Sequence, residues 1–177
     1  MRQIVLLRGI NVGPSNRIAM SQLRELLASA SAEEVRTYLQ SGNVVLASEA
    51  SPEDLARETR RRIADAFGLD IEVLVRSGEE LATVVERDPL GSVALDPKRY
   101  QVSFLSAELD PGTLARLQAL AAPEERIVAG GRELYCWHPD GVARSKLWNE
   151  LAGRRLGVTV TSRNWTTVTS LLAMVRA

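Results

Sequence analysis

The sequence has very few of the residues on which several familiar chemistries depend. It contains one cysteine, Cys136, and one histidine, His138. A single cysteine excludes an internal disulfide and a multi-cysteine metal site, and it fits a reducing compartment. His138 precedes a Pro-Asp-Gly turn, a position more typical of a turn residue than of a catalytic base. We therefore expect no metal site and no catalytic triad.

Long apolar runs are also missing. A membrane-spanning helix needs about 18 or more consecutive apolar residues, and no window of this chain approaches that length. The apolar run near the N-terminus ends at Arg8 after four residues. We expect a buried strand there rather than a signal peptide, no association with membranes, and a cytoplasmic location.

Neither sign of charge is in excess, because Lys plus Arg and Asp plus Glu both number 22. The total therefore gives no reason to expect a general polyanion binder. The distribution is uneven, however. Residues 1–30 carry four arginines against one glutamate, a net of +3, and residues 141–177 carry six basic residues against Glu150, a net of +5, so the middle must be −8.

The first half of the chain has the periodicity of alternating strands and helices. Helix start and stop signals are clearest at Ser51, Pro52 and Gly68, and Ser21 is expected to cap the helix before them. The expected elements are a strand over 2–8, a helix carrying Met20, Leu23, Leu26 and Leu27 on one face, strands over 35–40 and 43–47, a helix over 52–68, a strand over 70–75 and a helix over 78–86.

Residues 88–98 read as a connector, after which the same order begins again. Strands are expected over 100–105, 126–129, 133–137 and 158–160, and helices over 110–121 and 145–157 and after Asn164. We therefore predict an α+β fold with two ferredoxin-like (β-α-β-β-α-β) modules, 1–90 and 98–177, each followed by an extra helix. The alternative is one continuous sheet with the same elements.

Two polar turns in the first half are candidate binding positions. The segment LLRGINVG leaves the first strand through Gly9 and Gly13, and Arg8 and Asn11 add a charge and an amide. A glycine-marked turn from strand to helix is suited to holding an anion. The alternative is that the glycines only permit an unusual backbone path. No Walker or dinucleotide fingerprint is present, so we expect no cofactor.

The second polar turn is QSGN at residues 40–43. Its functional interpretation is that the side chains of Gln40, Ser41 and Asn43 read the polar edge of a ligand. Glycine and asparagine are also what a tight turn requires, which is the structural alternative.

Two basic segments mark expected helix starts in the second half, Arg144, Ser145 and Lys146, and Arg163, Asn164 and Trp165. Ser145 and Asn164 are natural N-caps. Cations near a helix start oppose the helix dipole, so a bound anion would explain them, and a solvated or salt-bridged face is the alternative. Trp165 is more typical of core packing than of a stacking platform. The arginine-rich run over 57–63 is interleaved with acids and reads as a solvated face.

The motifs LLRGINVG, TYLQSGNVV, RSKL and TSRNWTTV, in this order, resemble a bacterial family known as domain of unknown function 1697. The resemblance runs from residue 4 to about residue 172. It implies an α+β fold with two ferredoxin-like parts, a cytoplasmic location and no established activity. The sequence departs from the family pattern at Pro14, Ala19, Thr166 and Ser170, where the family commonly has other residues.

Together the motifs favour a binding protein that holds a small anionic ligand, such as a nucleotide, or nucleic acid backbone where the modules meet. One alternative is a metal-independent group-transfer or hydrolytic enzyme that uses Ser41 or Ser145 with Lys146. The other is an interaction or assembly module without a ligand that uses open sheet edges.

Overall fold

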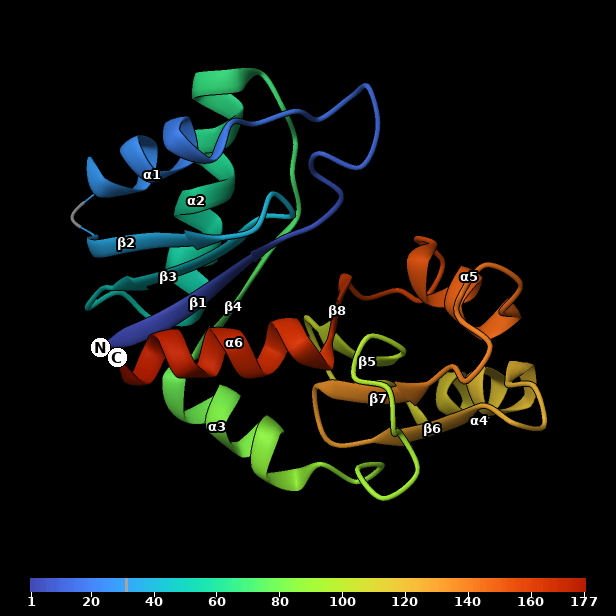
Figure 1. Ribbon diagram of the computed structural model, residues 1–177. Coiled ribbons are helices and arrows are strands. Elements are labelled where there is room, and N and C mark those ends of the chain that lie inside the picture. Colours follow the sequence, from blue (N-terminus) through green and yellow to red (C-terminus); the bar gives the residue numbers. More distant parts are fainter. Residues whose placement is uncertain (31) are drawn as a thin grey trace. The chain divides into compact units, whose positions relative to one another are not determined.

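The computed structural model describes residues 1–30 and 32–177 and contains the same order of elements twice (Figure 1). The first run is β1 (Arg2–Leu7), α1 (Met20–Ala28), β2 (Glu33–Tyr38), β3 (Asn43–Ala47), α2 (Pro52–Phe67), β4 (Val73–Ser77) and α3 (Gly78–Arg87). The second run is β5 (Tyr100–Leu105), α4 (Pro111–Leu120), β6 (Arg126–Ala129), β7 (Glu133–Trp137), α5 (Lys146–Ala152), β8 (Val160–Asn164) and α6 (Trp165–Arg176).

The chain forms two compact units. The first comprises Met1–Thr83 with Ser170–Ala177, and the second comprises Val84–Thr169. The last part of α6 therefore belongs to the first unit, where Arg2 and Arg36 donate hydrogen bonds to the carbonyls of Val175 and Met174 at 2.8 and 2.6 Å. These bonds satisfy carbonyl groups that the end of a helix leaves without partners.

Each unit contains one antiparallel sheet, with strand orders β2-β3-β1-β4 and β6-β7-β5-β8. These are the orders of a ferredoxin-like sheet, so the predicted fold class is confirmed and the alternative of one continuous sheet is wrong. The registers match as well. Leu6 pairs with Asn43 as Phe104 pairs with Glu133, and Ile4 pairs with Arg76 as Val102 pairs with Arg163.

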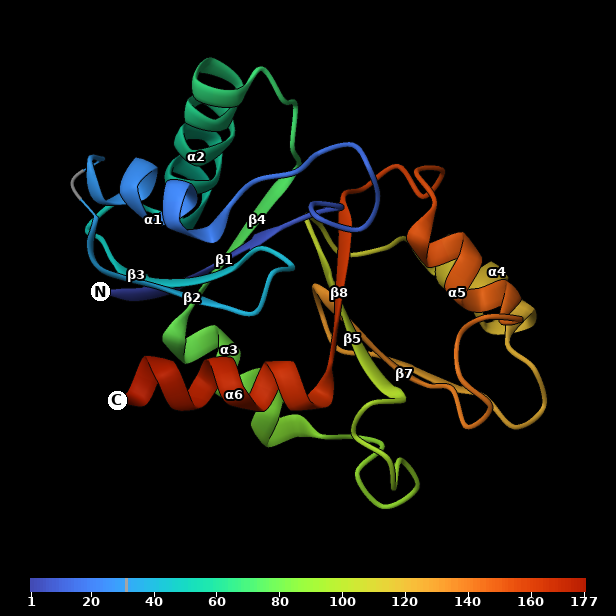
Figure 2. The same ribbon diagram turned by 45° about the horizontal axis from the view of Figure 1, so that its top comes forward.

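The first core lies between its sheet and the helices α1 and α2, which cover one face (Figure 2). Alternate strand residues point toward these helices, as the period of a strand requires. The buried residues that they share with the helices are Val5, Leu7, Val44, Leu46, Leu23, Leu27 and Ile63. The predicted apolar face of α1 is confirmed, since Met20, Leu23 and Leu27 are buried and Leu26 is partly buried.

The helix α2 begins and ends where the sequence predicted. The Ser51 side chain accepts a hydrogen bond from the Asp54 N–H, and Gly68 closes the helix with a φ of 66°.

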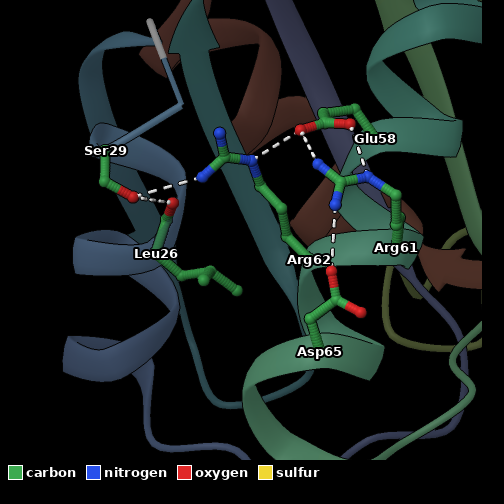
Figure 3. A network of polar contacts seen from close by, with 6 residues as sticks. All are labelled: Leu26, Ser29, Glu58, Arg61, Arg62 and Asp65. Carbon is green, nitrogen blue, oxygen red and sulfur yellow. Dashed lines mark hydrogen bonds and ion pairs between the residues drawn. The ribbon is translucent and has the colours of Figure 1, made fainter.

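The arginine-rich outer side of α2 is ion-paired (Figure 3). Arg61 contacts Glu58 at 2.7 Å and Asp65 at 2.9 Å, and Arg62 contacts Glu58 at 2.7 Å. The hydrogen bonds from these arginines lower the pKa of Glu58 to about 2. Arg57, Arg60 and Arg61 are exposed, so the prediction of a solvated face for this run is confirmed.

The second core lies between its own sheet and the helices α4 and α5. The helix α4 begins after Asp110, as the sequence predicted, and the Asp110 side chain caps it by accepting from the Thr113 N–H. The buried residues of this core include Leu105, Leu134, Cys136 and Val160 from the strands and Leu117, Leu147 and Leu151 from the helices. Among the described residues, none of the helices combines the length and the apolar composition needed to cross a membrane.

Five details differ from the sequence-based prediction. The strand β2 covers Glu33–Tyr38 rather than residues 35–40, because the turn begins at Leu39, whose φ is 58°. Ser21 lies inside α1, whose N-cap is Ala19 and makes no side-chain capping bond. The helix α5 ends at Ala152 rather than near Gly157, because Gly153 adopts an extended conformation. The strands β4 and β8 begin at Val73 and Val160 and extend further than predicted, since polar residues such as Arg76 and Arg163 continue the pairing with the central strand.

Gly42, in the turn between β2 and β3, packs against the loop that follows β1. The Leu7 N–H donates to the Gly42 carbonyl at 2.9 Å. A Cβ atom at Gly42 would lie 2.7 Å from Leu7 Cβ and 2.9 Å from Ile10 Cδ1, and the Gly42 φ is +80°. Only glycine therefore fits this turn as it stands.

We predict that Gly42→Ala destabilises the first unit by about 2 to 5 kcal/mol, because the strained φ costs about 1 to 2 kcal/mol and the overpacking about 1 to 3 kcal/mol more. The free energy of unfolding followed by far-ultraviolet circular dichroism measures this. The matched control is Gly68→Ala, which has the same kind of φ (+66°) and nothing within 4 Å of its added Cβ. Equal losses in the two variants would contradict the packing argument.

Candidate functional site

Two of the sequence motifs meet within the first unit. The Asn11 side chain donates to the carbonyls of Ile18 and Gln40 at 2.9 and 2.7 Å and accepts from the Ile18 N–H at 2.9 Å. Asn11 itself has a φ of 56°. Its amide therefore closes the loop after β1 and ties that loop to the β2–β3 turn.

Asn43 has a similar role on the other side of this contact. It is fully buried, and its amide donates to the Tyr38 carbonyl at 3.1 Å and to the Ser41 hydroxyl at 3.0 Å. Gln40 and Ser41 are exposed. The geometry thus gives the Asn11 and Asn43 amides structural partners and leaves the Gln40 side chain at the surface.

Arg8 and Gly13 complete the N-terminal candidates. The Arg8 guanidinium forms an ion pair with Glu72 at 3.0 Å, and both side chains are largely shielded from solvent. Gly13 has space around it for a side chain and no positive φ, whereas Gly9 has a φ of +66°. The charge of Arg8 is therefore balanced by a carboxylate within the same unit.

The second unit contains a pocket of about 730 Å³, and Arg144, Ser145 and Lys146 all line it. Its walls come from the end of α4 and the residues after it, from the turn after β7, and from the start of α5. The other lining residues are Ala119, Leu120, Ala121, Ala122, Glu124, Glu125, Pro139, Asp140, Gly141 and Ala143. Apolar side chains and charges of both signs thus share one pocket.

A buried carboxylate, Glu125, joins two of these walls. Its Oε1 accepts from the Ala122 N–H at 3.0 Å, and its Oε2 accepts from the Ser145 hydroxyl at 2.7 Å and contacts His138 Nδ1. Burial by itself would raise the pKa of Glu125, but the hydrogen bonds from Ser145, Ala122 and His138 outweigh it and lower that pKa below its ordinary value.

The sequence placed His138 in a turn and Ser145 at a helix start, but it gave no sign of their shared partner. His138 does begin the turn, since its carbonyl accepts from the Gly141 N–H at 2.9 Å, and its side chain is fully buried. Ser145 caps α5 by accepting from the Trp148 N–H at 3.0 Å. No local signal in the sequence joins Glu125 to these two residues, because His138 and Ser145 are 13 and 20 positions away.

The third group, Arg163, Asn164 and Trp165, lies elsewhere in the second unit and does not line this pocket. Arg163 is 9% exposed, and its guanidinium donates to the Thr161 hydroxyl at 2.8 Å and to the Ser162 carbonyl at 2.9 Å. Burial lowers its pKa to about 10. Asn164 caps α6 by accepting from the Thr167 N–H at 2.9 Å.

Trp165 is half-buried and packs against another aromatic ring. Its ring stacks on Tyr100 with the centroids 4.7 Å apart and an angle of 14° between the planes. Cys136, the single thiol, is also buried, and burial raises its pKa far above the ordinary value. Within residues 1–30 and 32–177, no group of three or more His, Cys, Asp and Glu side chains is placed to hold a metal ion.

The fold has a close counterpart among solved structures. The conserved bacterial protein SP0830 from Streptococcus pneumoniae superimposes with a TM-score of 0.81, and the match covers 98% of each chain at 24% sequence identity. A likeness at this level of identity shows a common fold. No curated protein matches the sequence significantly.

The sequence itself matches a family model over residues 1–135. This stretch includes the LLRGINVG and QSGNV motifs, whereas the pocket residues Arg144, Ser145 and Lys146 lie beyond its end. The family is described as a protein of unknown function, DUF1697. The model covers most of the chain and confirms the resemblance carried by the motifs, so the protein belongs to the DUF1697 family of proteins of unknown function.

Proposed function

We propose that the second unit binds a small anionic ligand, such as a phosphate-bearing metabolite, in the pocket lined by Arg144 and Lys146. The main observation behind this proposal is that Arg144 and Lys146 both line one pocket of about 730 Å³. Ligand pockets of proteins commonly enclose about 300 to 1,000 Å³ and combine apolar walls with a few polar groups. This pocket has the size for a ligand as large as a nucleotide.

The charges of the two cations support the anionic part of the proposal. Both side chains are exposed at the pocket, and neither makes an ion pair or side-chain hydrogen bond within the described residues. Arginine binds carboxylate and phosphate through two parallel hydrogen bonds, and lysine adds a compact charge. By contrast, Arg8 is paired with Glu72, and Arg163 is buried.

The contacts of Glu125 are a second observation that supports the proposal. A binding site is effective when its walls are held in place before the ligand arrives. Glu125 bonds to Ala122 beyond α4 and to Ser145 at the start of α5, next to the two cations. It therefore fixes the segment that presents Arg144 and Lys146.

The same contacts weaken the case for Ser145 as a nucleophile. Its hydroxyl donates to Glu125 and accepts from the Trp148 N–H. A serine nucleophile needs a neighbouring base that takes its proton. The lowered pKa of Glu125 makes this carboxylate a weak base, and Ser145 is better explained as a helix cap.

We predict that the double variant Arg144→Ala, Lys146→Ala loses at least about tenfold in affinity for phosphate-bearing probes, which corresponds to about 1.4 kcal/mol. Isothermal titration calorimetry against inorganic phosphate and a panel of nucleoside monophosphates measures this. The matched control is Lys98→Ala, Arg155→Ala, which removes the same charge from exposed positions of this unit outside the pocket. Equal losses in both variants would indicate general charge attraction and would reject the pocket.

A second prediction concerns Glu125, which links two walls of the pocket. Glu125→Gln should lower the free energy of unfolding of the second unit by about 1.5 to 3 kcal/mol at neutral pH, because buried hydrogen bonds to a charged group are lost. The three tryptophans, Trp137, Trp148 and Trp165, all lie in this unit, so their fluorescence follows its denaturation. The neighbouring variant Glu124→Gln is the control and should change stability by less than about 0.5 kcal/mol.

The difference in the free energy of unfolding between the wild type and Glu125→Gln should depend on pH in a definite direction. A carboxyl whose pKa is lowered by folding stabilises the protein above its unfolded pKa and loses that contribution as the pH falls through the folded pKa. The gap between wild type and Glu125→Gln should therefore be largest near neutral pH and should shrink as the pH falls below about 4.5, the ordinary pKa of a glutamate. A gap that stays constant down to acidic pH would contradict the role assigned to the ionised carboxylate.

A further inference from the structure

We propose that the ligand of this pocket carries a positive as well as a negative charge. This inference rests on the proposed function and names the chemical class of its ligand. The pocket is lined by two exposed cations, Arg144 and Lys146, and by two exposed acids, Glu124 and Asp140. The two signs are therefore equally represented among its exposed charges.

None of these four side chains has a partner within the described residues. This distinguishes them from another charged residue of the second unit, Glu150. Glu150 of α5 accepts from Arg116 at 2.7 Å and lies 3.6 Å from Arg155, and the hydrogen bond from Arg116 lowers its pKa. Two positive and two negative side chains of the pocket are thus available to a bound molecule.

Glu125, the remaining acid of the lining, does not change this balance. It is buried, and its oxygens are occupied by the Ala122 N–H, the Ser145 hydroxyl and His138. Its position is that of a structural link between the walls. The charges that a ligand meets are therefore those of Glu124, Asp140, Arg144 and Lys146.

A ligand with only negative charge would fit this set poorly. Arg144 and Lys146 attract it, but Glu124 and Asp140 repel it, and like charges at a binding surface select against the wrong partner. A molecule that joins an amine to a phosphate or carboxylate satisfies both pairs. The alanines over 119–122 and Pro139 give the pocket apolar walls for the part that joins the two charged groups.

The test uses the full chain and pairs of probes that differ in one group. The first set consists of linear alkyl phosphates of increasing length, and the second consists of the same molecules with an amine at the far end. Titration calorimetry should show that the best amino phosphate binds at least about tenfold more tightly than its amine-free counterpart. A third set, amino carboxylates of the same lengths, shows whether phosphate or carboxylate is the preferred anion.

The double variant Glu124→Gln, Asp140→Asn tests whether the preference for amino phosphates arises in the pocket. It should abolish the advantage of the amine and bind the plain alkyl phosphate at least as well as the wild type does. The control variant, Glu108→Gln with Glu86→Gln, removes the same charge at exposed positions outside the pocket and should retain the advantage.

The outcomes separate this inference from the proposed function. Equal binding of the two phosphate series by the wild type would overturn the inference and leave an anion site in place. Tight binding of simple alkyl amines without any anionic group would overturn it as well. Binding of no probe in any set, including the nucleotides, would reject both the ligand class and the proposed function.

Discussion

Both units depend on one recurring interaction, the antiparallel bond between the end of the central strand and the turn that precedes its neighbour. In the first unit the Leu7 N–H donates to the Gly42 carbonyl at 2.9 Å, and in the second the Leu105 N–H donates to the Arg132 carbonyl at 2.9 Å. These bonds fix where the chain leaves each sheet. From these bonds onward the central strand pairs with its neighbour in the same register in both units.

The two units share the same sheet topology but hold their polar side chains in different ways. In the first, side-chain amides and an ion pair hold the polar loops in place, and Asn11, Asn43 and Arg8 all have partners there. In the second, one buried carboxylate, Glu125, holds the wall and leaves the charges beside it exposed. The matched registers, in which Arg76 and Arg163 take equivalent places, are those expected of a duplicated unit whose halves have diverged.

Local signals carried much of the fold prediction. The caps at Ser51 and Asn164, the helix start at Asp110 and the hairpin over 126–137 are predicted correctly because each depends on residues within a few positions. The prediction was wrong where long-range contacts decide. Ser21, whose residue type favours a cap, lies inside α1, and β8 is longer than predicted because its pairing with β5 continues through the polar residues Ser162 and Arg163.

The sequence by itself determined the order of elements, the fold class and the family, since hydrophobic periodicity and turn residues act over short distances. Only the tertiary structure decided which polar residues are exposed to a ligand. It gave the Asn11 and Asn43 amides partners within the first unit, buried Arg163, and placed Glu124, Asp140, Arg144 and Lys146 around one pocket. The physical reason is that a polar side chain is available to a ligand only if the fold leaves it without a partner, and its partners come from distant parts of the chain.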